Sequence, residues 1–190
     1  KLSILDSLAD KVDQLILGGG IANTFLKAQG FNIGNSLHEN DFIDSAKKII
    51  QKLESRGASL PLVTDVICGK QLNENEIAVK KNINDLEPTD MIFDLGPETM
   101  KGITKNLKQS KTILWNGPIG VFEFDQFSKG TETLAHAIAN SIGFSLAGGG
   151  DTIAALEKFG MIKNISYIST AGGAFLEFVE GKKLPAIEIL

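Results

Sequence analysis

The stretch FSLAGGGDTIAALEKFG, residues 144–160, joins a short apolar run to three glycines, an acidic residue and an amphipathic run. The run Phe144–Ala147 predicts a buried strand, whereas the apolar spacing of Asp151–Phe159 predicts a helix. Glycines at such a junction let backbone N–H groups face a ligand, and a helix N-terminus adds unpaired donors with a partial positive charge. This strand–glycine–helix unit therefore indicates an α/β fold and a place where a phosphate can bind.

The unit recurs along the chain, since short apolar runs alternate with amphipathic ones. Strands that are apolar on both faces are covered by helices on both sides, so the pattern predicts one domain with a doubly wound α/β fold. We expect a mainly parallel, Rossmann-like sheet with helices on both faces, and we expect the polar segment 69–90 to be a surface excursion. The predicted strands are Gln14–Leu17, Leu62–Cys68, Met91–Leu95, Thr112–Trp115, Phe144–Ala147 and Tyr167–Thr170. The predicted helices are Ile21–Ala28, Asp41–Ser55, Pro97–Lys108, Gly130–Asn140, Asp151–Phe159 and Ala174–Glu180.

Glycine-bearing stretches follow five of the predicted strands, as LILGGG, FDLGPE, LWNGPIGVFE, LAGGGDT and STAGG. In an open α/β sheet the loops after the strands gather at one edge, and ligands bind there. For any single stretch, glycines that only end a strand and begin a tight turn are the favoured interpretation. For five stretches on one edge, a binding surface is favoured instead.

The composition is typical of a soluble globular protein, with 43% hydrophobic and 22% charged residues. The net charge of −4 and the lack of a basic tract argue against a nucleic-acid partner. The single cysteine, Cys68, cannot form an internal disulfide, which favours a reducing compartment such as the cytoplasm. No apolar run approaches the ~18 residues of a transmembrane helix, so no membrane partner is expected. The chain opens on Lys1 rather than Met, which suggests a fragment.

Two acidic residues lie beside the glycine stretches. Asp151 and a bound phosphate would place two anions in one pocket, and Mg²⁺ between them would remove that conflict; a helix-capping carboxylate is an equally weighted alternative. Glu123 can accept hydrogen bonds from a ribose diol, although patterning alone favours a solvated charge beside core residues. Neither G-x-x-x-x-G-K-[ST] nor G-x-G-x-x-G occurs, which disfavours a P-loop protein and a dinucleotide oxidoreductase.

Four stretches in this order, LILGGGIANTFLKAQG, TILWNGPIGVFE, LAGGGDTIAALEKFG and YIST-GGAFLEFVEGKKLPA, resemble the phosphoglycerate kinase family. More narrowly, they resemble the C-terminal domain of its bacterial type. The resemblance implies that residues 1–190 are the nucleotide-binding C-terminal domain of a two-domain kinase, with a loose tail at 184–190 and the N-terminal substrate domain absent. It also implies a monomeric glycolytic enzyme that transfers a phosphoryl group between 1,3-bisphosphoglycerate and ADP, giving 3-phosphoglycerate and ATP, with Mg²⁺.

The resemblance also implies roles for individual residues. Asp151 is implied as the Mg²⁺ ligand, acting together with the nucleotide phosphates, and Glu123 as the partner of the ribose hydroxyls. The walls of an adenine pocket are implied at Gly18, Gly19, Leu95 and Gly96. Contacts along the nucleotide are implied at Asn116, Gly117 and Pro118, and a phosphate cradle at Gly149, Gly150 and Thr152. The transferring phosphoryl group is implied to meet Lys1, Gly172 and Gly173, of which Lys1 also contacts the nucleotide.

One position departs from the family pattern, because the triple glycine that follows Ser-Thr in the family reads Ala171-Gly172-Gly173 here. We expect only the two glycines to be necessary, although alanine would be strained if that backbone needed a positive φ. In-line transfer in this family needs closure of two domains, so we expect this chain alone to bind Mg-nucleotide without catalysing transfer. A non-catalytic nucleotide-binding module and a dinucleotide oxidoreductase domain are the alternatives.

Overall fold

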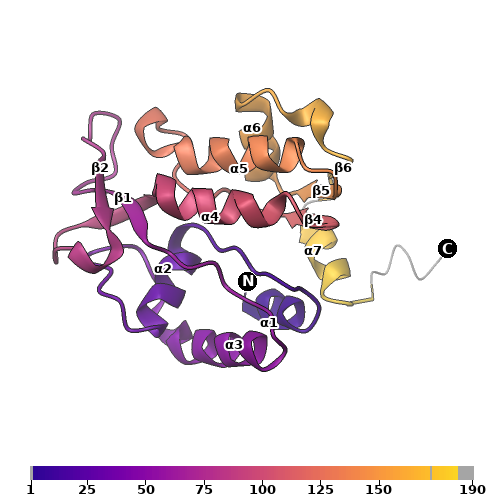
Figure 1. Cartoon of the computed structure of the whole chain (residues 1–190), viewed down its shortest axis with the longest axis horizontal. Coiled ribbons are helices and arrows are strands. Elements are labelled where there is room, and N and C mark those ends of the chain that lie inside the picture. The colour runs from indigo at the N-terminus through magenta and orange to yellow at the C-terminus, as the bar shows by residue number, and fades with distance from the viewer. Residues whose placement is uncertain (1, 172, 184–190) are drawn as a thin grey trace.

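The structure is a computed structural model that describes residues 2–171 and 173–183 (Figure 1). Three helices and two strands come first in the described residues, and from residue 91 onward strands and helices alternate; four short 3₁₀ helices (η) lie between these elements. The helices are α1 (Leu2–Ala9), α2 (Gly19–Ala28), α3 (Ile43–Ser55), α4 (Pro97–Leu107), α5 (Lys129–Ala139), α6 (Gly150–Lys158) and α7 (Gly173–Val179). The strands are β1 (Asp65–Gly69), β2 (Val79–Asn82), β3 (Met91–Leu95), β4 (Thr112–Trp115), β5 (Phe144–Gly148) and β6 (Tyr167–Ser169). The 3₁₀ helices are η1 (Asn40–Phe42), η2 (Ile83–Asp85), η3 (Asp125–Phe127) and η4 (Ile162–Asn164).

The strands form two three-stranded sheets. One is parallel, in the order β4-β5-β6, and the other is antiparallel, in the order β2-β1-β3. In the parallel sheet Trp115 is paired with Ala147, and Gly148 with Ser169, so the carboxyl ends of its strands lie next to one another. The predicted α/β class with a parallel sheet is therefore confirmed, and an antiparallel sheet that was not predicted accompanies it.

The predicted strand Gln14–Leu17 forms only one parallel bridge, between Gln14 and Ser59. Ser59 exchanges two backbone hydrogen bonds with this run, donating to Asp13 and accepting from Leu15. The next bond of a parallel ladder would need the N–H of residue 61, which is proline and has none. The pairing therefore stops after a single bridge, and this run was wrongly predicted as a strand.

Two other predictions need correction in detail. The strand predicted from Leu62 begins only at Asp65, and the polar segment 69–90 contains β2 as well as surface loops. Strand β2 lies at the edge of its sheet and three of its four residues are exposed, so it carries no apolar pattern. All six predicted helices are present within two residues of the expected bounds, and α1 was not predicted.

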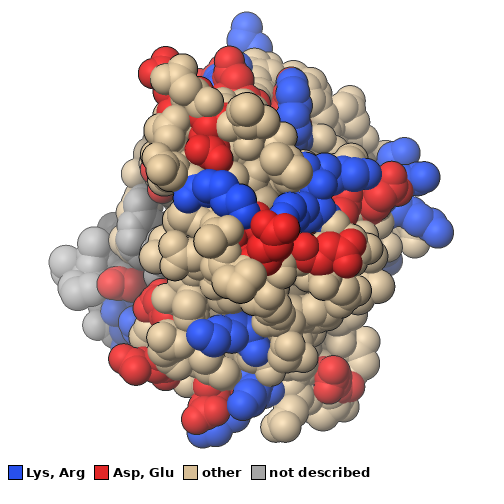
Figure 2. All heavy atoms as spheres, turned by 90° about the vertical axis from the view of Figure 1, so that its left-hand side faces the viewer, with Lys and Arg blue, Asp and Glu red and all other residues tan. Residues whose placement is uncertain are grey.

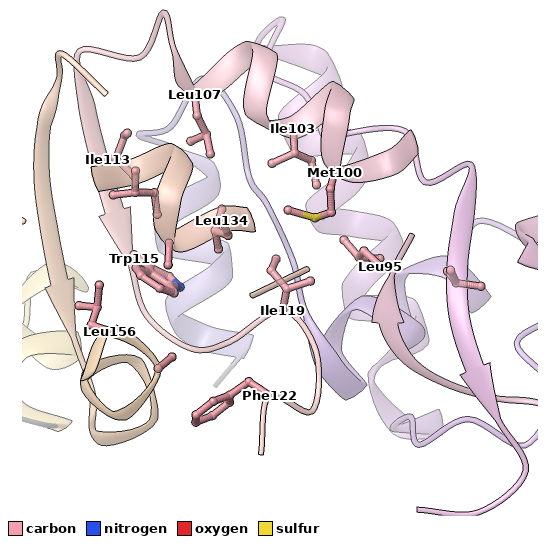
Figure 3. Packing of buried hydrophobic residues seen from close by; sticks show 14 of the residues in the cluster. Leu95, Met100, Ile103, Leu107, Ile113, Trp115, Ile119, Phe122, Leu134 and Leu156 are labelled. Carbon is pink, nitrogen blue, oxygen red and sulfur yellow. The ribbon is translucent and has the colours of Figure 1, made fainter. Parts of the chain in front are cut away.

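Among the described residues, the core consists of two hydrophobic clusters. The larger one lies among α4, α5, α6 and both sheets, and includes Met100, Trp115 and Leu156 (Figure 3). The smaller one joins α1, α2 and α3, where Ala46, Ile49 and Leu53 form the buried stripe that the spacing of α3 predicts. In Figure 1, α4 and α5 run side by side above α1 and α3. Among the described residues, no helix combines the length and the apolarity that crossing a bilayer requires.

Candidate functional site

The loop that follows β4, residues 116–120, contacts the loop that precedes α2. The N–H of Gly19 donates to the carbonyl of Ile119 at 2.9 Å. A Cβ placed on Gly18 would lie 2.6 Å from both the Ile119 Cα and the Pro118 carbonyl oxygen. Such distances are too short for any side chain, so Gly18 allows two backbone segments to approach. The structure thus brings Gly18, Gly19 and Pro118 together. The sequence predicted that the two glycine stretches to which they belong lie at one edge.

The same loop is bound to the start of α6. The side-chain amide of Asn116 donates to the Gly148 carbonyl at 2.6 Å, and the Gly117 N–H donates to the Thr152 hydroxyl at 2.7 Å. Gly149 has a φ of 95°, a conformation that residues with a Cβ rarely adopt. A Cβ on Gly149 would also lie 2.8 Å from the Asn116 amide nitrogen. The glycine before α6 is therefore required both by its backbone conformation and by its neighbour.

The end of β3 reaches this loop as well, through a buried carboxylate that the sequence reasoning missed. The Asp94 side chain accepts hydrogen bonds from the N–H of Gly130 at 2.6 Å and from its neighbour Leu95 at 2.9 Å. A Cβ on Gly120 would lie 2.3 Å from an Asp94 carboxylate oxygen. Burial raises the pKa of Asp94 to about 7, although the two N–H donors oppose that shift. Its sequence signal was an acid inside the apolar strand MIFDL.

Leu95 and Gly96 continue from β3 into α4. The Leu95 side chain is part of the larger hydrophobic cluster. Gly96 is the N-cap of α4, and a Cβ there would lie 2.3 Å from the carboxyl carbon of Asp65. The Asp65 carboxylate accepts from the N–H of Thr99 at 2.8 Å and so satisfies the start of the helix. Gly96 therefore has a structural role in admitting Asp65.

Only some of the residues that were expected to wall an adenine pocket line a common cavity. Gly19 and Leu95 line one cavity, together with Asp94 and Ile119, but its volume is about 10 Å³. Such a space holds about one water molecule at most, so a purine has no room inside it. The side chain of Leu37, which the sequence reasoning did not single out, is 74% exposed, and a Cβ on Gly20 would lie 3.4 Å from it. An apolar surface is thus available beside the glycines of α2.

Asp151 and Glu123 are both exposed, and neither side chain makes a hydrogen bond or ion pair within residues 2–171 and 173–183. The N-cap of α6 is Gly149, with no side-chain capping bond, so Asp151 is not the capping residue. It lies in the first turn, where the partial positive charge of the helix favours a carboxylate. The first N–H groups of α6, those of Gly150 and Asp151, have no partner in the described part of the chain.

The fifth glycine stretch follows β6, whose Ser169 is paired with Gly148 shortly before α6. Gly173 begins α7, whereas the predicted site residues Lys1 and Gly172 lie outside the described residues, as does the predicted tail 184–190. Within the described chain, no residue other than glycine has a positive φ, so Ala171 carries no strain of that kind. The N–H of Ala171 donates to the Ser169 hydroxyl at 3.3 Å.

A wide hollow of about 550 Å³ is lined by Asn35, Lys70, Pro88 and Thr89, none of which is a predicted site residue. Its charges are compensated, because Lys70 and Lys81 both bind the buried Asp90 carboxylate at 2.8 Å. These lysines lower the pKa of Asp90 to about 2 against the opposing effect of burial. Figure 2, which views the molecule from the side of β2, shows acidic and basic residues intermixed without a field of one sign.

Comparison with known proteins identifies relatives along the whole chain. A family model described as phosphoglycerate kinase matches residues 1–182. Curated relatives with that name, from Francisella philomiragia and Francisella tularensis strain WY96-3418, are 60% and 58% identical over 190 residues, covering 100% of this chain and 48% of each relative.

Solved structures of phosphoglycerate kinases are similar as well. The one from Coxiella burnetii has a TM-score of 0.96 at 55% identity and covers 100% of this chain and 49% of its own. The one from Pyrococcus horikoshii OT3 has a TM-score of 0.82 at 28% identity and covers 98% of this chain and 47% of its own. The chain therefore spans about half the length of the relatives that it matches.

Proposed function

This chain belongs to the phosphoglycerate kinase family, and from that premise we propose that it is the nucleotide-binding half of such an enzyme. It binds ADP or ATP with Mg²⁺ at the edge where loop 116–120 meets the start of α6. The complete reaction transfers a phosphoryl group between 1,3-bisphosphoglycerate and ADP, giving 3-phosphoglycerate and ATP. The glycerate substrate would bind to the other half of the enzyme, which this chain does not include.

The observation that carries the proposal is the free start of α6. Gly150 and Asp151 have N–H groups without partners among the described residues, and the adjoining glycines leave the backbone bare. Helix N-termini of this kind bind phosphate groups, because the donors and the helix dipole both favour an anion. The side chains of Asn116 and Thr152 hold the neighbouring loop in place without covering these donors. The arrangement therefore suits a nucleotide phosphate.

The residues present also suit a magnesium ion. The carboxylate of Asp151 is exposed and has no partner among the described residues. Within that part of the chain no three His, Cys, Asp or Glu side chains converge on one point, so a metal at Asp151 needs ligands from elsewhere. Mg²⁺ is typically held by one or two carboxylates together with substrate phosphate oxygens and water. When bound, the ion would neutralise negative charge on the phosphates.

The nucleoside would lie on the surface rather than in a closed pocket. The cavity between Gly19 and Leu95 is too small for a base, whereas the exposed Leu37 beside Gly20 offers an apolar contact. Glu123 lies in the turn after loop 116–120, and its exposed carboxylate can accept hydrogen bonds from two ribose hydroxyls. Asn116, Gly117 and Pro118 would then run along the nucleotide, between the ribose and the phosphates.

Transfer itself needs more than this chain. The transition state of phosphoryl transfer spreads charge over three oxygens, and protein groups stabilise it when they are positioned and water is excluded. Asp151 and the N–H groups at the start of α6 are open to solvent. The proposed groups nearest the transferring phosphoryl are Lys1, Gly172 and Gly173. We expect a monomeric, cytoplasmic chain that binds nucleotide and shows no transfer until the other half is supplied.

A calorimetric titration of the chain with ADP tests the proposal, with and without Mg²⁺ and in the variants Asp151→Ala and Glu157→Ala. Glu157 is an exposed acid near the other end of α6 and is the matched control. We expect saturable binding that Mg²⁺ strengthens, with that strengthening lost in Asp151→Ala and kept in Glu157→Ala. A folded wild-type chain that does not bind ADP would contradict the proposed site. Adding the N-terminal half of a relative should then produce transfer activity; binding without any such gain would indicate a non-catalytic module.

A further inference from the structure

Helix α6 holds the segment 117–125 at two points. In its first turn, the Thr152 hydroxyl accepts the Gly117 N–H. At its last residue, the Lys158 ammonium donates to the Phe122 carbonyl and to the Asp125 carboxylate, both at 2.8 Å. The two helix residues are six positions apart, which is about 9 Å along the axis. The segment that carries Glu123 is therefore held along the length of the helix that carries Asp151.

Lys158 acts on the peptide bond that directly precedes Glu123. The carbonyl that it binds belongs to the planar peptide between Phe122 and Glu123, so the hydrogen bond fixes the orientation of that plane. The turn is closed by the Phe124 N–H, which donates to the Val121 carbonyl at 3.2 Å. The Phe122 side chain is buried in the larger hydrophobic cluster (Figure 3). Glu123 thus projects from a turn that is fixed by the buried ring and by Lys158.

The ion pair between Lys158 and Asp125 is the weaker part of this arrangement. Asp125 is 92% exposed, and exposed pairs of this kind contribute little to stability. The pair nevertheless balances the charge of the ammonium, and Lys158 lowers the pKa of Asp125. Two of the three N–H donors of the ammonium are thus engaged within the chain. The bond to the Phe122 carbonyl is therefore the contact with a functional consequence.

We propose that Lys158 is a positioning residue that orients Glu123 toward the ribose hydroxyls of the nucleotide. The proposal rests on the proposed function, because it takes Glu123 to be the ribose ligand. It makes a specific demand: loss of the Lys158 ammonium must weaken binding only through the hydroxyl groups, not through the phosphates or the base.

Calorimetry with two nucleotides tests this demand. Lys158→Met keeps the aliphatic stem and removes the ammonium, and Lys163→Met in η4 is the matched control because Lys163 is exposed. We expect Lys158→Met to bind MgADP about fivefold more weakly, the effect of losing about one hydrogen bond. Its affinity for Mg-2′,3′-dideoxy-ADP should stay within about twofold of wild type, since that ligand lacks both hydroxyls. Combining Lys158→Met with Glu123→Gln should weaken MgADP binding no further than Glu123→Gln alone.

Equal weakening of both nucleotides, or additive effects of the two substitutions, would overturn the proposal. Lys158→Arg should retain most of the wild-type affinity, because a guanidinium keeps the positive charge and has several N–H donors for the same two oxygens. A measurement without nucleotide separates this proposal from the proposed function: amide hydrogen exchange at Phe124 should quicken in Lys158→Met and not in Lys163→Met. Unchanged exchange would refute the positioning role even where ADP binds, whereas a wild-type chain that binds no ADP would refute the function itself.

Discussion

The backbone N–H of Gly117 donates a 2.7 Å hydrogen bond to the Thr152 hydroxyl, which ties the loop after β4 to the first turn of α6. Thr152 is fully buried, and Gly117 is half-buried. The side chain therefore fixes the loop against the helix. We therefore expect Thr152 to contribute to phosphate binding through its backbone and through the loop position that its hydroxyl maintains.

Thr152→Val should destabilise the chain and weaken ADP binding, because the isosteric side chain leaves the Gly117 N–H without an acceptor. An unpaired buried donor costs about 1–3 kcal/mol, and because Gly117 is half-buried we expect the lower end of that range. Urea denaturation and ADP titration measure the two effects. Thr152→Ser keeps the hydroxyl and should retain most of the affinity for ADP, and Thr133→Val, at an exposed position of α5, should change neither quantity. Wild-type behaviour of Thr152→Val would show that the contact is dispensable.

Gly18→Ala should separate the two loops that meet at the proposed nucleotide site. Its φ of −131° suits alanine, so the cost arises only from the contacts of the new methyl group with Pro118 and Ile119. Overpacking of this kind costs about 1–3 kcal/mol. The control is Gly102→Ala in α4, where a Cβ meets nothing within 4 Å; it should stabilise the chain by roughly 0.5–1 kcal/mol. Denaturation curves of equal midpoint for Gly18→Ala and wild type would contradict the close approach of the two backbones.

Cys68 should resist thiol reagents in the folded chain. Its side chain is buried in the larger hydrophobic cluster, and burial raises the pKa of the thiol to about 12, so almost no reactive thiolate exists at neutral pH. We expect labelling by a disulfide reagent at pH 8 to proceed only through unfolding, and therefore to quicken with urea in step with the loss of folded protein. Rapid stoichiometric labelling without denaturant would show that β1 opens locally.

The sequence was most informative where one short segment determines its own structure. Pro97 at the first position of α4 and the glycines before α2 and α6 mark helix starts directly, and the structure begins these helices within two residues of the predicted positions. The parallel strands β4, β5 and β6 are recognisable because their apolar runs are bounded by loops. The convergence of the glycine stretches after β4, β5 and β6 on one edge follows from the general geometry of parallel strands. The stretches after Leu17 and β3 do not follow parallel strands, so that geometry does not account for their position.

What the sequence did not predict depends on partners that are distant along the chain. The run Gln14–Leu17 is strand-like by itself, and only its pairing with Ser59, two residues before Pro61, shows why the ladder ends. Gly96 and Gly120 lie in glycine stretches that suggested a ligand surface, yet each admits a carboxylate of the chain itself, from Asp65 or Asp94. The role of Lys158 depends on its contact with the Phe122 carbonyl, which lies 36 residues earlier in the chain. None of these contacts has a local signature.

Asp94 should make the stability of the chain depend on pH near neutrality. Its pKa is about 7 in the folded chain, whereas the ordinary value is 3.8, so between these values the folded state holds a proton that the unfolded state has released. The free energy of unfolding therefore falls as the pH rises toward 7 and levels off above it. From pH 5.5 to 8 we expect a loss of about 2 kcal/mol. Asp90, whose pKa is lowered to about 2, acts only at lower pH.

Asp94→Asn removes the titrating group and is the variant to compare. The amide of asparagine has one acceptor oxygen, whereas the two N–H donors bind two different oxygens of Asp94. The donor at Gly130 or Leu95 is therefore left unpaired, and the variant should be less stable at pH 5.5. Its deficit relative to wild type should shrink by about 2 kcal/mol at pH 8, because only the wild type carries a buried charge there. Urea denaturation at both pH values measures the deficit. A constant deficit would mean that Asp94 is already ionised at pH 5.5, held in that form by the two N–H groups and the start of α5.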